Sequence, residues 1–489
     1  MRRKKKQTYC HYRGGYIMTY TSEDIKTITD AQKEYFRTGV TLDIDFRIRQ
    51  LLRLKKALIR NEDKILEALG RDLGRTKTEA YLCDVGMMIL EINETVKGLK
   101  KWAKPELHLS GPACFPSMVT KVYKMPYGTT LILSPFNFPI LLSLGVLIAA
   151  IAGGNTAVLK VSSKSSACSR ITARLIAKIY PKEYVTVVEG GHDVADMCLA
   201  QPFDKIFYTG SPKVARHVLA EAANNLTPCA LELGGETGNW ALVRKDANLR
   251  DAARKIVFFK LINSGQICIN VNQIAVAEEV ADEFVSLLKK EFIRQIGENA
   301  PENPEYPKLI TPEAYRKCAD EAELYRDRIV FGGFGNRDKC KYAPTVIYPV
   351  NADEPIVRHE LFNPLLPVVT YKDREIDKML DIIDRREKPL AFYVFTRNIP
   401  WAEKIMQTMQ FGGGCINEVC YHMIVKGVPF NGTGHSGMGA YHGEWGFKEF
   451  THPQTVLRGS THFNLPLREH PYTGFIGKLK FRLLKAFEK

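Results

Sequence analysis

Residues 129–161 read TTLILSPFNFPILLSLGVLIAAIAGGNTAVLKV, and this stretch decides the fold class. Two short apolar runs, 129–133 and 156–161, flank a longer apolar run at 140–152 that ends at a pair of glycines. Runs of five or six residues are typical of buried strands, and the longer run has the length of a buried helix. The stretch therefore predicts a strand–helix–strand unit, from which parallel sheets are built.

The same alternation continues along the chain. Further strands are expected at 185–188 and 205–208, and further helices at 166–179 and 214–223. Such a series predicts a parallel, doubly wound sheet of the dinucleotide-binding (Rossmann) type. After Glu232 a second series of strands and helices begins and runs to about Val419. We therefore expect an α/β protein with two sheet domains.

Composition limits the class of protein. The chain has 489 residues, of which 45% are hydrophobic and 25% charged, as in ordinary globular proteins. Its 11 cysteines are scattered and include no Cys-x-x-Cys pair, which predicts neither a disulfide framework nor a metal site. This cysteine usage favours a cytoplasmic, reduced protein. The net charge is +15, and six basic residues without an acid lie at 1–17. We expect residues 1–17 to be disordered, with Met18 as an alternative start.

Two motifs contain candidate catalytic residues. Cys268 ends the sequence NSGQIC at 263–268, and Glu232 lies within LELGG at 231–235. A cysteine after a glycine turn is a candidate nucleophile, although most cysteines are inert core residues. A carboxylate between two leucines is not typical of a solvated surface. Together they indicate covalent catalysis followed by base-assisted release of a thioester.

Two loops contain further candidates. Asn137 lies between two prolines in SPFNFP at 134–139, where its amide can donate to a developing oxyanion. The alternative is an ordinary helix cap. The loop YTGSPKVA at 208–215 links a strand to a helix, where a phosphate would meet the helix N-terminus. This loop lacks the glycine fingerprint of dinucleotide sites, so by itself it is a weak signal.

In order and spacing, these motifs resemble the aldehyde dehydrogenase superfamily over residues 31–471. The segment SGMG at 436–439 with YHG at 441–443 is most similar to class 3, which includes fatty and aromatic aldehyde dehydrogenases. The matching motifs are Pro135-Phe136-Asn137-Phe138-Pro139, Gly153-Gly154-Asn155 through Leu159-Lys160, Thr209-Gly210-Ser211, Leu231-Glu232-Leu233-Gly234-Gly235, Ser264-Gly265-Gln266-Ile267-Cys268 and Glu360-Leu361-Phe362-Asn363-Pro364.

The resemblance implies a mechanism and a set of contacts. Cys268 would attack the aldehyde, Asn137 and the Cys268 N–H would hold the oxyanion, and Glu232 would activate the hydrolytic water. The cofactor would be NAD or NADP, the substrate a medium- or long-chain aliphatic or aromatic aldehyde, and the assembly a homodimer. The implied cofactor contacts are Ser134, Pro135, Phe136, Lys160, Ser162, Ser163, Gly210, Ser211, Pro212, Lys213, Val214, Ala215, Leu233, Gly234, Glu360 and Phe362.

The resemblance also implies a domain plan. We expect a cofactor-binding domain at 18–231, a catalytic domain at 232–419, and a return to the cofactor domain with an oligomerisation arm at 420–471. A strand near 117–128 would belong to that arm, because its exposed, charge-alternating part at 120–126 is suited to pairing with another subunit.

The tail at 472–489 is predicted to form a basic amphipathic helix. Its apolar positions Ile476, Leu479, Leu483 and Phe487 fall on one face. Such a helix is compatible with peripheral contact at an anionic membrane surface, and equally with docking on the protein itself or a partner subunit.

The chain departs from the family pattern at supporting positions. Ser163 replaces the usual glutamate and leaves room for the 2′-phosphate of NADP beside Lys160. Ala215 and Asn363 replace glycines, Glu236 replaces a lysine, and Asn431 stands in the segment that is usually Pro-Phe-Gly-Gly. None of these changes removes a catalytic group.

The sequence gives less support to three other functions. A CoA-acylating dehydrogenase generally lacks the glutamate at the position of Glu232. The presence of Glu232 in this chain therefore favours hydrolysis. A non-catalytic binding protein on the same fold would be expected to have lost Cys268, Asn137 or Glu232. A nucleic-acid-binding role rests on net charge alone, with no matching module, and is not expected.

Overall fold

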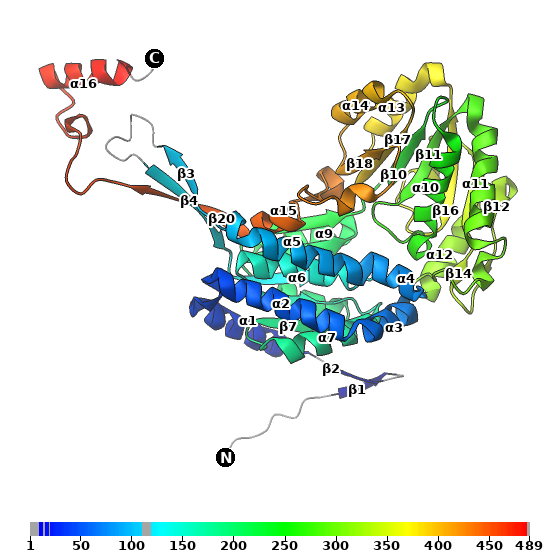
Figure 1. The fold of residues 1–489 in the computed structure, drawn as a ribbon, viewed down its shortest axis with the longest axis horizontal. Helices are drawn as coiled ribbons and strands as arrows, with labels where there is room; N and C mark the ends of the chain where they lie inside the picture. Colours follow the sequence, from blue (N-terminus) through cyan, green and yellow to red (C-terminus); the bar gives the residue numbers. More distant parts are fainter. Residues whose placement is uncertain (1–8, 13–14, 19, 110–118, 487–489) are drawn as a thin grey trace.

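The computed structural model describes residues 9–12, 15–18, 20–109 and 119–486 (Figure 1). Its first sheet has six strands in the order β19-β9-β8-β5-β6-β7. All neighbours in this sheet are parallel except β19, which pairs antiparallel with β9. The prediction of a parallel, doubly wound sheet is confirmed. The strands are β5 (Thr129–Leu133), β6 (Thr156–Lys160), β7 (Val185–Val188), β8 (Lys205–Gly210), β9 (Cys229–Leu233) and β19 (Gly437–Met438).

Helices cover both faces of this first sheet. The predicted apolar helix is α6 (Leu141–Gly153), and every residue of it is buried, which explains its uninterrupted hydrophobic sequence. On its side of the sheet lie α2 (Ile44–Arg60), α3 (Glu62–Leu73), α5 (Gly86–Trp102), α7 (Ser166–Ile179) and the short α4 (Lys77–Ala80). The opposite face is covered by α1 (Ser22–Arg37), α8 (His192–Leu199) and α9 (Pro212–Ala223).

The second sheet has seven strands in the order β12-β15-β16-β11-β10-β17-β18. It is parallel except for β12, which pairs antiparallel with β15. Its strands are β10 (Asn239–Val243), β11 (Val271–Ala277), β12 (Ile329–Phe331), β15 (Thr345–Val350), β16 (Leu365–Tyr371), β17 (Ala391–Phe395) and β18 (Gly413–Ile416). Its helices are α10 (Leu249–Leu261), α11 (Ala281–Ile296), α12 (Pro312–Glu323), α13 (Ile376–Asp384) and α14 (Ile399–Thr408), and a hairpin of β13 (Gly335–Asn336) and β14 (Lys341–Tyr342) lies beside them.

The boundary between the two sheets differs slightly from the expected one. Glu232 and Leu233 belong to β9 of the first sheet, and the second sheet begins at Asn239. The apolar residues of β9 continue through Leu233, so the strand does not end at the expected boundary after 231. Glu232 therefore lies in the strand of the first sheet that directly precedes the second sheet along the chain.

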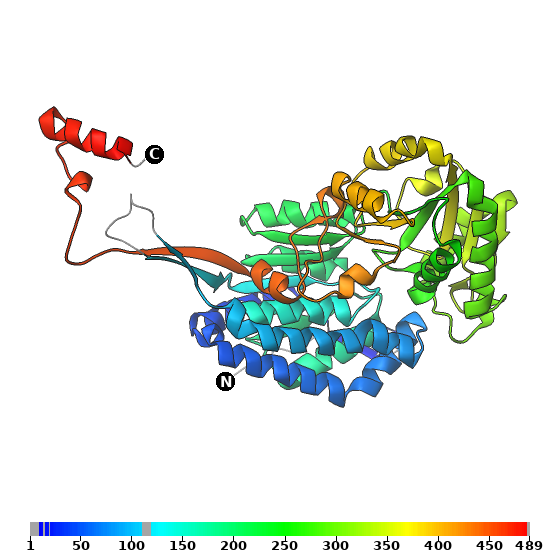
Figure 2. The same cartoon turned by 45° about the horizontal axis from the view of Figure 1, so that its top comes forward.

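A three-stranded arm projects from the body of the protein (Figures 1 and 2). Its order is β20-β4-β3, formed by β3 (Glu106–Leu109), β4 (Val119–Pro126) and β20 (Thr451–Arg458), and α15 (Gly443–Glu449) leads into β20. All eight residues of β20 pair with β4. The strand expected near 117–128 is thus present over its described part, whereas 117–118 lie outside the described residues. Helix α16 (Gly474–Ala486) lies beyond the arm, away from both sheets.

The N-terminal segment differs from expectation where it is described. Strands β1 (Tyr9–Tyr12) and β2 (Gly15–Met18) pair antiparallel. The expectation of disorder over 1–17 does not match these strands, and the remainder of that segment lies outside the described residues. Among the described helices, none is both long and apolar enough to cross a membrane.

Candidate active site

Many of the predicted cofactor contacts lie at the carboxyl ends of three adjacent strands, β5, β6 and β8. Strand β5 lies between β6 and β8, so the chain order reverses at this point of the sheet. The loop 134–140 follows β5, Lys160 ends β6, and Gly210 ends β8. Open α/β sheets bind ligands in the crevice at this position.

Asn137 is held by the turn that precedes Cys268. Its side chain is buried, and its Nδ2 donates to the carbonyl oxygen of Gln266 at 3.2 Å. Its own carbonyl accepts from Asn263 Nδ2 at 3.0 Å and from Arg75 Nη2 at 2.6 Å. Asn137 and the turn that precedes Cys268 therefore form one hydrogen-bonded unit.

Arg75 and Asp84 support that unit, and sequence reasoning missed both. Their fully buried side chains form an ion pair with Nη1 and Oδ2 2.6 Å apart. The other oxygen of Asp84 accepts from the backbone N–H groups of Ile140 at 3.0 Å and Leu141 at 2.8 Å, at the start of α6. Neither residue lies in a recognisable local motif, so no signal in the sequence could have found the pair.

Cys268 follows a turn of unusual backbone conformation. Asn263 and Ser264 both have φ of 52°, and Gly265 has φ of 78°. A side chain at Gly265 would collide with the carbonyl of Asn363, so this position requires glycine. Non-glycine residues in the left-handed region cluster at functional sites. The turn is fixed by the Ser264 hydroxyl, which donates to Tyr306 at 2.9 Å.

Burial, together with the carboxylates of Glu360 and Glu232, raises the pKa of the Cys268 thiol to about 12. The backbone N–H groups of Cys268 and Ile269 oppose this shift. The resting side chain is therefore a thiol, and a base must remove its proton before it attacks. Glu232 thus lies within electrostatic range of Cys268.

Glu232 is buried in the strand β9, opposite Thr209 of β8 and Gly437 of β19. Burial raises its pKa well above the usual value, and the Glu449 carboxylate adds to the shift. Its Oε2 has no hydrogen-bond partner among the described residues. A buried carboxylate with a raised pKa and a free oxygen has the properties of a general base.

Glu360 offers a second buried carboxylate oxygen. Its Oε1 has no partner within the described chain, and burial raises its pKa to about 8. A side chain at Gly234 would collide with this carboxylate, so glycine is needed there. Phe362 makes an edge contact with Phe136 at 5.9 Å between ring centroids, which joins this loop to the one after β5. These features fit a polyhydroxyl ligand such as a ribose.

The expected adenosine side of the site lies at the ends of β6 and β8. Lys160 is buried, donates to the carbonyls of Val161 at 2.9 Å and Gly190 at 2.8 Å, and has a pKa lowered by burial. Ser163 is exposed. The remaining expected contacts lie beside these strand ends. They are Ser134 and Pro135 after β5, Ser162 after β6, Ser211, Pro212, Lys213 and Val214 at the start of α9, and Leu233 at the end of β9.

Two of the departures from the family pattern have clear structural roles. Ala215 is buried in the helix–sheet contact beneath α9, where a methyl group fits. Glu236 accepts from Arg216 of α9 at 2.5 Å and contacts His435 at 3.0 Å, so it links that helix to the turn before β19. The arginine hydrogen bond lowers the pKa of Glu236 and keeps it charged.

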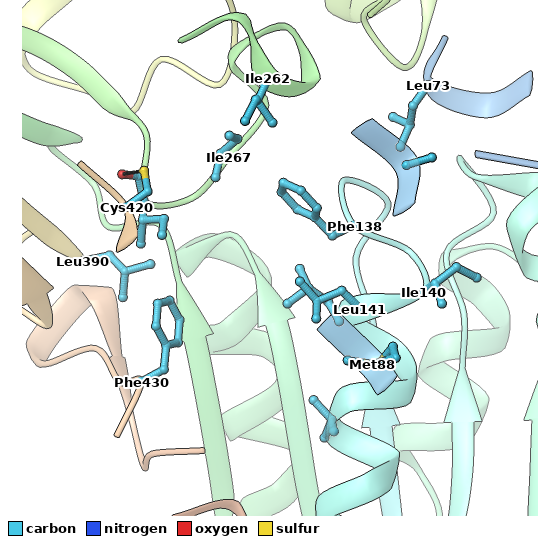
Figure 3. Packing of buried hydrophobic residues seen from close by; sticks show 14 of the residues in the cluster. Leu73, Met88, Phe138, Ile140, Leu141, Ile262, Ile267, Leu390, Cys420 and Phe430 are labelled. Atoms are coloured by element: carbon cyan, nitrogen blue, oxygen red, sulfur yellow. Dashed lines mark hydrogen bonds between the residues drawn. The ribbon is translucent and has the colours of Figure 1, made fainter. Parts of the chain in front are cut away.

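An apolar hollow of about 110 Å³ is lined in part by Ile267 and Ile269, the chain neighbours of Cys268. Figure 3 shows Phe138, next to Asn137 in the chain, facing Ile262 and Ile267. The lining is hydrophobic throughout: Leu82, Cys83, Met87, Phe138, Phe258, Phe259, Ile262, Ile267, Ile269, Cys420, Tyr421, Met423 and Ile424. In the part of the chain that is described, no group of three or more His, Cys, Asp or Glu side chains is arranged to hold a metal ion.

Comparisons with known proteins agree with this geometry. The model of the aldehyde dehydrogenase family matches residues 4–456. A 4,4'-diaponeurosporen-aldehyde dehydrogenase of Staphylococcus aureus is 37% identical over 94% of this chain and 97% of its own length. A dimeric, NADP-preferring aldehyde dehydrogenase of Mus musculus is 32% identical over 89% and 94%. The substrate-bound structure of Staphylococcus aureus AldH has a TM-score of 0.91 and 36% identity over 95% of this chain and 99% of that one.

Proposed function

This chain belongs to the aldehyde dehydrogenase family, and we propose that it oxidises an apolar aldehyde to its carboxylic acid with NAD or NADP, releasing the acid by hydrolysis. The observation that carries the hydrolytic step is the buried Glu232 carboxylate, whose free oxygen and raised pKa suit a base acting near Cys268.

The first step forms a bond to sulfur. Glu232 takes the proton of the Cys268 thiol, and the thiolate attacks the carbonyl carbon of the aldehyde. The Asn137 amide and the backbone N–H of Cys268 donate to the oxyanion that results. Arg75 and Asn263 keep the Asn137 loop in place through its carbonyl oxygen.

The second step releases the acid. NAD or NADP, when bound, supplies the acceptor for the hydride that leaves the substrate carbon. As the hydride leaves, the oxyanion becomes a carbonyl group, and the acyl group stays on Cys268 as a thioester. The unpaired Oε1 of Glu360 and the space beside Gly234 would hold the ribose of the cofactor. Lys160 would contact the adenosine side of the cofactor. Glu232, having lost its first proton to solvent, takes a proton from water. The hydroxide attacks the thioester carbon, and Cys268 leaves as a thiolate.

The apolar hollow supports the substrate class. Its lining offers no ionised side chain to pair with a charged substrate. A hydrocarbon chain or aromatic ring gains about 25 cal/mol for each Å² of apolar surface removed from water. A medium- or long-chain aliphatic aldehyde, or an aromatic one, therefore fits this site. The similar Staphylococcus aureus enzyme is named for a polyene aldehyde, which agrees in chemical class.

A steady-state panel of aldehydes tests this function. Aliphatic aldehydes of increasing length, benzaldehyde and a short hydrophilic aldehyde are supplied with NAD and with NADP, and nicotinamide reduction is followed by absorbance. We expect kcat/KM to rise with apolar size, the acid to be the product, and Cys268→Ser to abolish turnover. A CoA requirement would instead favour the acylating alternative, and absence of activity with every aldehyde would favour the non-catalytic one.

We also propose that the enzyme is a homodimer assembled through the arm. The outer strands β3 and β20 carry exposed apolar residues, including Leu107, Leu109 and Leu457. A partner arm would cover these side chains and pair the edges of the outer strands.

Helix α16 supports a further proposal, peripheral membrane contact by a cytoplasmic enzyme. Ile476, Leu479 and Leu483 are about half exposed on one face, and the basic residues Lys478, Arg482 and Lys485 lie on another. Co-flotation with vesicles containing anionic lipid tests this: deletion of 472–489 should abolish it. Equal flotation of the truncated and full-length chains would leave docking on a partner subunit as the role of the helix.

A further inference from the structure

Helices α2, α3 and α7 lie on the outer side of the first sheet (Figure 1). A strongly basic groove runs between them. On α7, Arg170, Arg174 and Lys178 are spaced by four residues and form one stripe. Arg53, Lys56 and Arg60 form a second stripe on α2. We call the set the basic groove: Arg53, Lys56, Arg60, Lys64, Arg71, Arg170, Arg174 and Lys178.

None of these eight side chains forms an ion pair within the described residues. Arg53 contacts only neutral groups, the Gln50 side-chain oxygen at 3.2 Å and the ring of Tyr180 at 6.0 Å. Arg170 donates to the Ser166 hydroxyl at 3.4 Å. The single acid in the lining is Glu67. Outside the lining, Arg170 and Arg174 oppose the burial that raises the pKa of the Glu189 carboxyl. Within the described part of the chain, the eight basic side chains therefore face only two acids, Glu67 and Glu189, and the groove keeps a large excess of positive charge.

The groove is concave. A hollow of about 660 Å³ lies between α2 and α7, and a second of about 310 Å³ lies between α3 and α7. The two are continuous, because Lys64, Ile171 and Arg174 line both. Leu175 and Ile179 contribute an apolar floor beneath the charged rim. A volume of this size is typical of small-ligand sites.

Unpaired like charges four residues apart on a helix destabilise it, so an anionic ligand would relieve repulsion as well as gain attraction. We propose that the basic groove binds a linear oligophosphate, free or as the phosphate tail of a nucleotide. Its two stripes would contact successive phosphates along the groove. The apolar floor would add contacts to an organic group carried by the phosphates.

The shape argues for this ligand over larger polyanions. A flat membrane surface would meet the rim without reaching the hollow, and a nucleic-acid duplex is wider than the space between two packed helices, whose axes are about 8–10 Å apart. The groove is also separate from the proposed cofactor contacts, none of which lines either hollow.

Tripolyphosphate binding, measured by calorimetry at low ionic strength, tests the proposal. The full-length enzyme is first saturated with NADP, so that its cofactor site is filled. The groove variant is Arg60→Glu with Lys64→Glu and Arg174→Glu. The matched control, Arg250→Glu with Lys290→Glu and Lys404→Glu, changes the same charge at exposed, unpaired positions of the second domain. We expect the groove variant to bind about tenfold more weakly or worse, and the control to bind like the wild type.

Further measurements distinguish a nucleotide from free oligophosphate as the ligand, and a milder variant guards against misfolding. ATP binding more tightly than tripolyphosphate would assign the nucleotide form, and equal binding the free phosphate. Arg174→Gln is the mild variant to be used if the triple variant does not fold. Equal tripolyphosphate affinity of groove and control variants would overturn the proposal, as would a change confined to the KM for NADP. Binding of RNA or anionic vesicles, without tripolyphosphate, would overturn it as well.

Discussion

The guanidinium of Arg75 donates to the carbonyl oxygen of Asn137 at 2.6 Å, across 62 residues of sequence. Its Nη1 is simultaneously paired with Asp84, which caps the helix that follows the Asn137 loop. The guanidinium group of Arg75 therefore fixes both the position of the proposed oxyanion donor, Asn137, and the start of α6. Lysine, with a single ammonium group, cannot reproduce this planar arrangement.

Arg75→Lys should lower kcat by about 10²-fold, near the effect of losing one oxyanion donor, because the Asn137 amide would lose its fixed position. The KM for cofactor should change little. The measurement is steady-state kinetics together with cofactor fluorescence titration.

Arg47→Lys is the matched control for this change. Arg47 is also buried and donates to the carbonyls of Thr41 at 2.7 Å and Ala152 at 3.0 Å, but it has no contact with the Asn137 loop. We expect it to lower the melting temperature without a comparable loss of kcat. Equal losses of kcat in both variants would assign Arg75 a purely structural role.

Helices and strands were predicted accurately from the sequence where their hydrophobic pattern is local. Helix 166–179 and strand 185–188 were predicted with the bounds found in α7 and β7, because their hydrophobic periodicity is local. Helix α9 begins at Pro212 instead of 214, because Ser211 caps it and proline is favoured in the first turn.

The site divides in the same way. Cys268, Glu232 and Asn137 lie in local motifs and were found, although their catalytic roles stay predictions. Arg75 and Asp84 were missed because their partners are set by tertiary packing: Asp84 caps a helix that starts 57 residues later. The end of β9 at Leu233 was missed because no turn residue separates 231 from 233.

Glu232→Gln should form the thioester but release it slowly. The glutamine amide cannot take a proton from water, whereas hydride transfer does not require that base. Stopped-flow absorbance at high pH, where the Cys268 thiol can ionise without it, should show a burst near one reduced nicotinamide per site and then a slow steady state. The variant Glu236→Gln, which alters a partly exposed carboxylate nearby, should keep normal release. Neither burst nor slowed release in Glu232→Gln would exclude it as the deacylation base.

Ser163→Glu should shift selectivity toward NAD. A carboxylate there would repel a 2′-phosphate and could accept from a 2′-hydroxyl. Lys164 Nζ lies 5.3 Å from the centroid of the Phe136 ring, so it is held near the site. We expect the ratio of kcat/KM for NADP over NAD to fall about tenfold. Ser166→Glu, with the same charge three residues later, is the control; an equal shift in both would place the ribose site elsewhere.

Light scattering at micromolar concentration should return a dimer. Leu107→Asp with Leu457→Asp should shift it toward monomer, because each carboxylate would have to be buried in the proposed contact. Leu324→Asp is the control, since Leu324 is 80% exposed on the second domain. A wild-type monomer, or dissociation caused equally by the control, would count against assembly through the arm.

The alkylation of Cys268 should depend steeply on pH. Burial and the carboxylates of Glu360 and Glu232 raise its pKa to about 12, so between pH 7 and 10 the thiolate fraction grows about tenfold for each pH unit. Iodoacetamide labelling, quantified by mass spectrometry of the peptide that contains Cys268, should follow that slope in the enzyme without cofactor. Glu360 itself has a pKa of about 8, so above that pH the Glu360→Gln variant lacks one negative charge, the pKa of Cys268 should be lower, and labelling should be faster. Glu387→Gln changes an exposed carboxylate that does not affect Cys268 and should leave the pH profile of labelling unchanged.

A labelling profile that levels off below pH 8 in the wild type would mean that the resting Cys268 side chain is already a thiolate. The proton transfer to Glu232 would then be unnecessary.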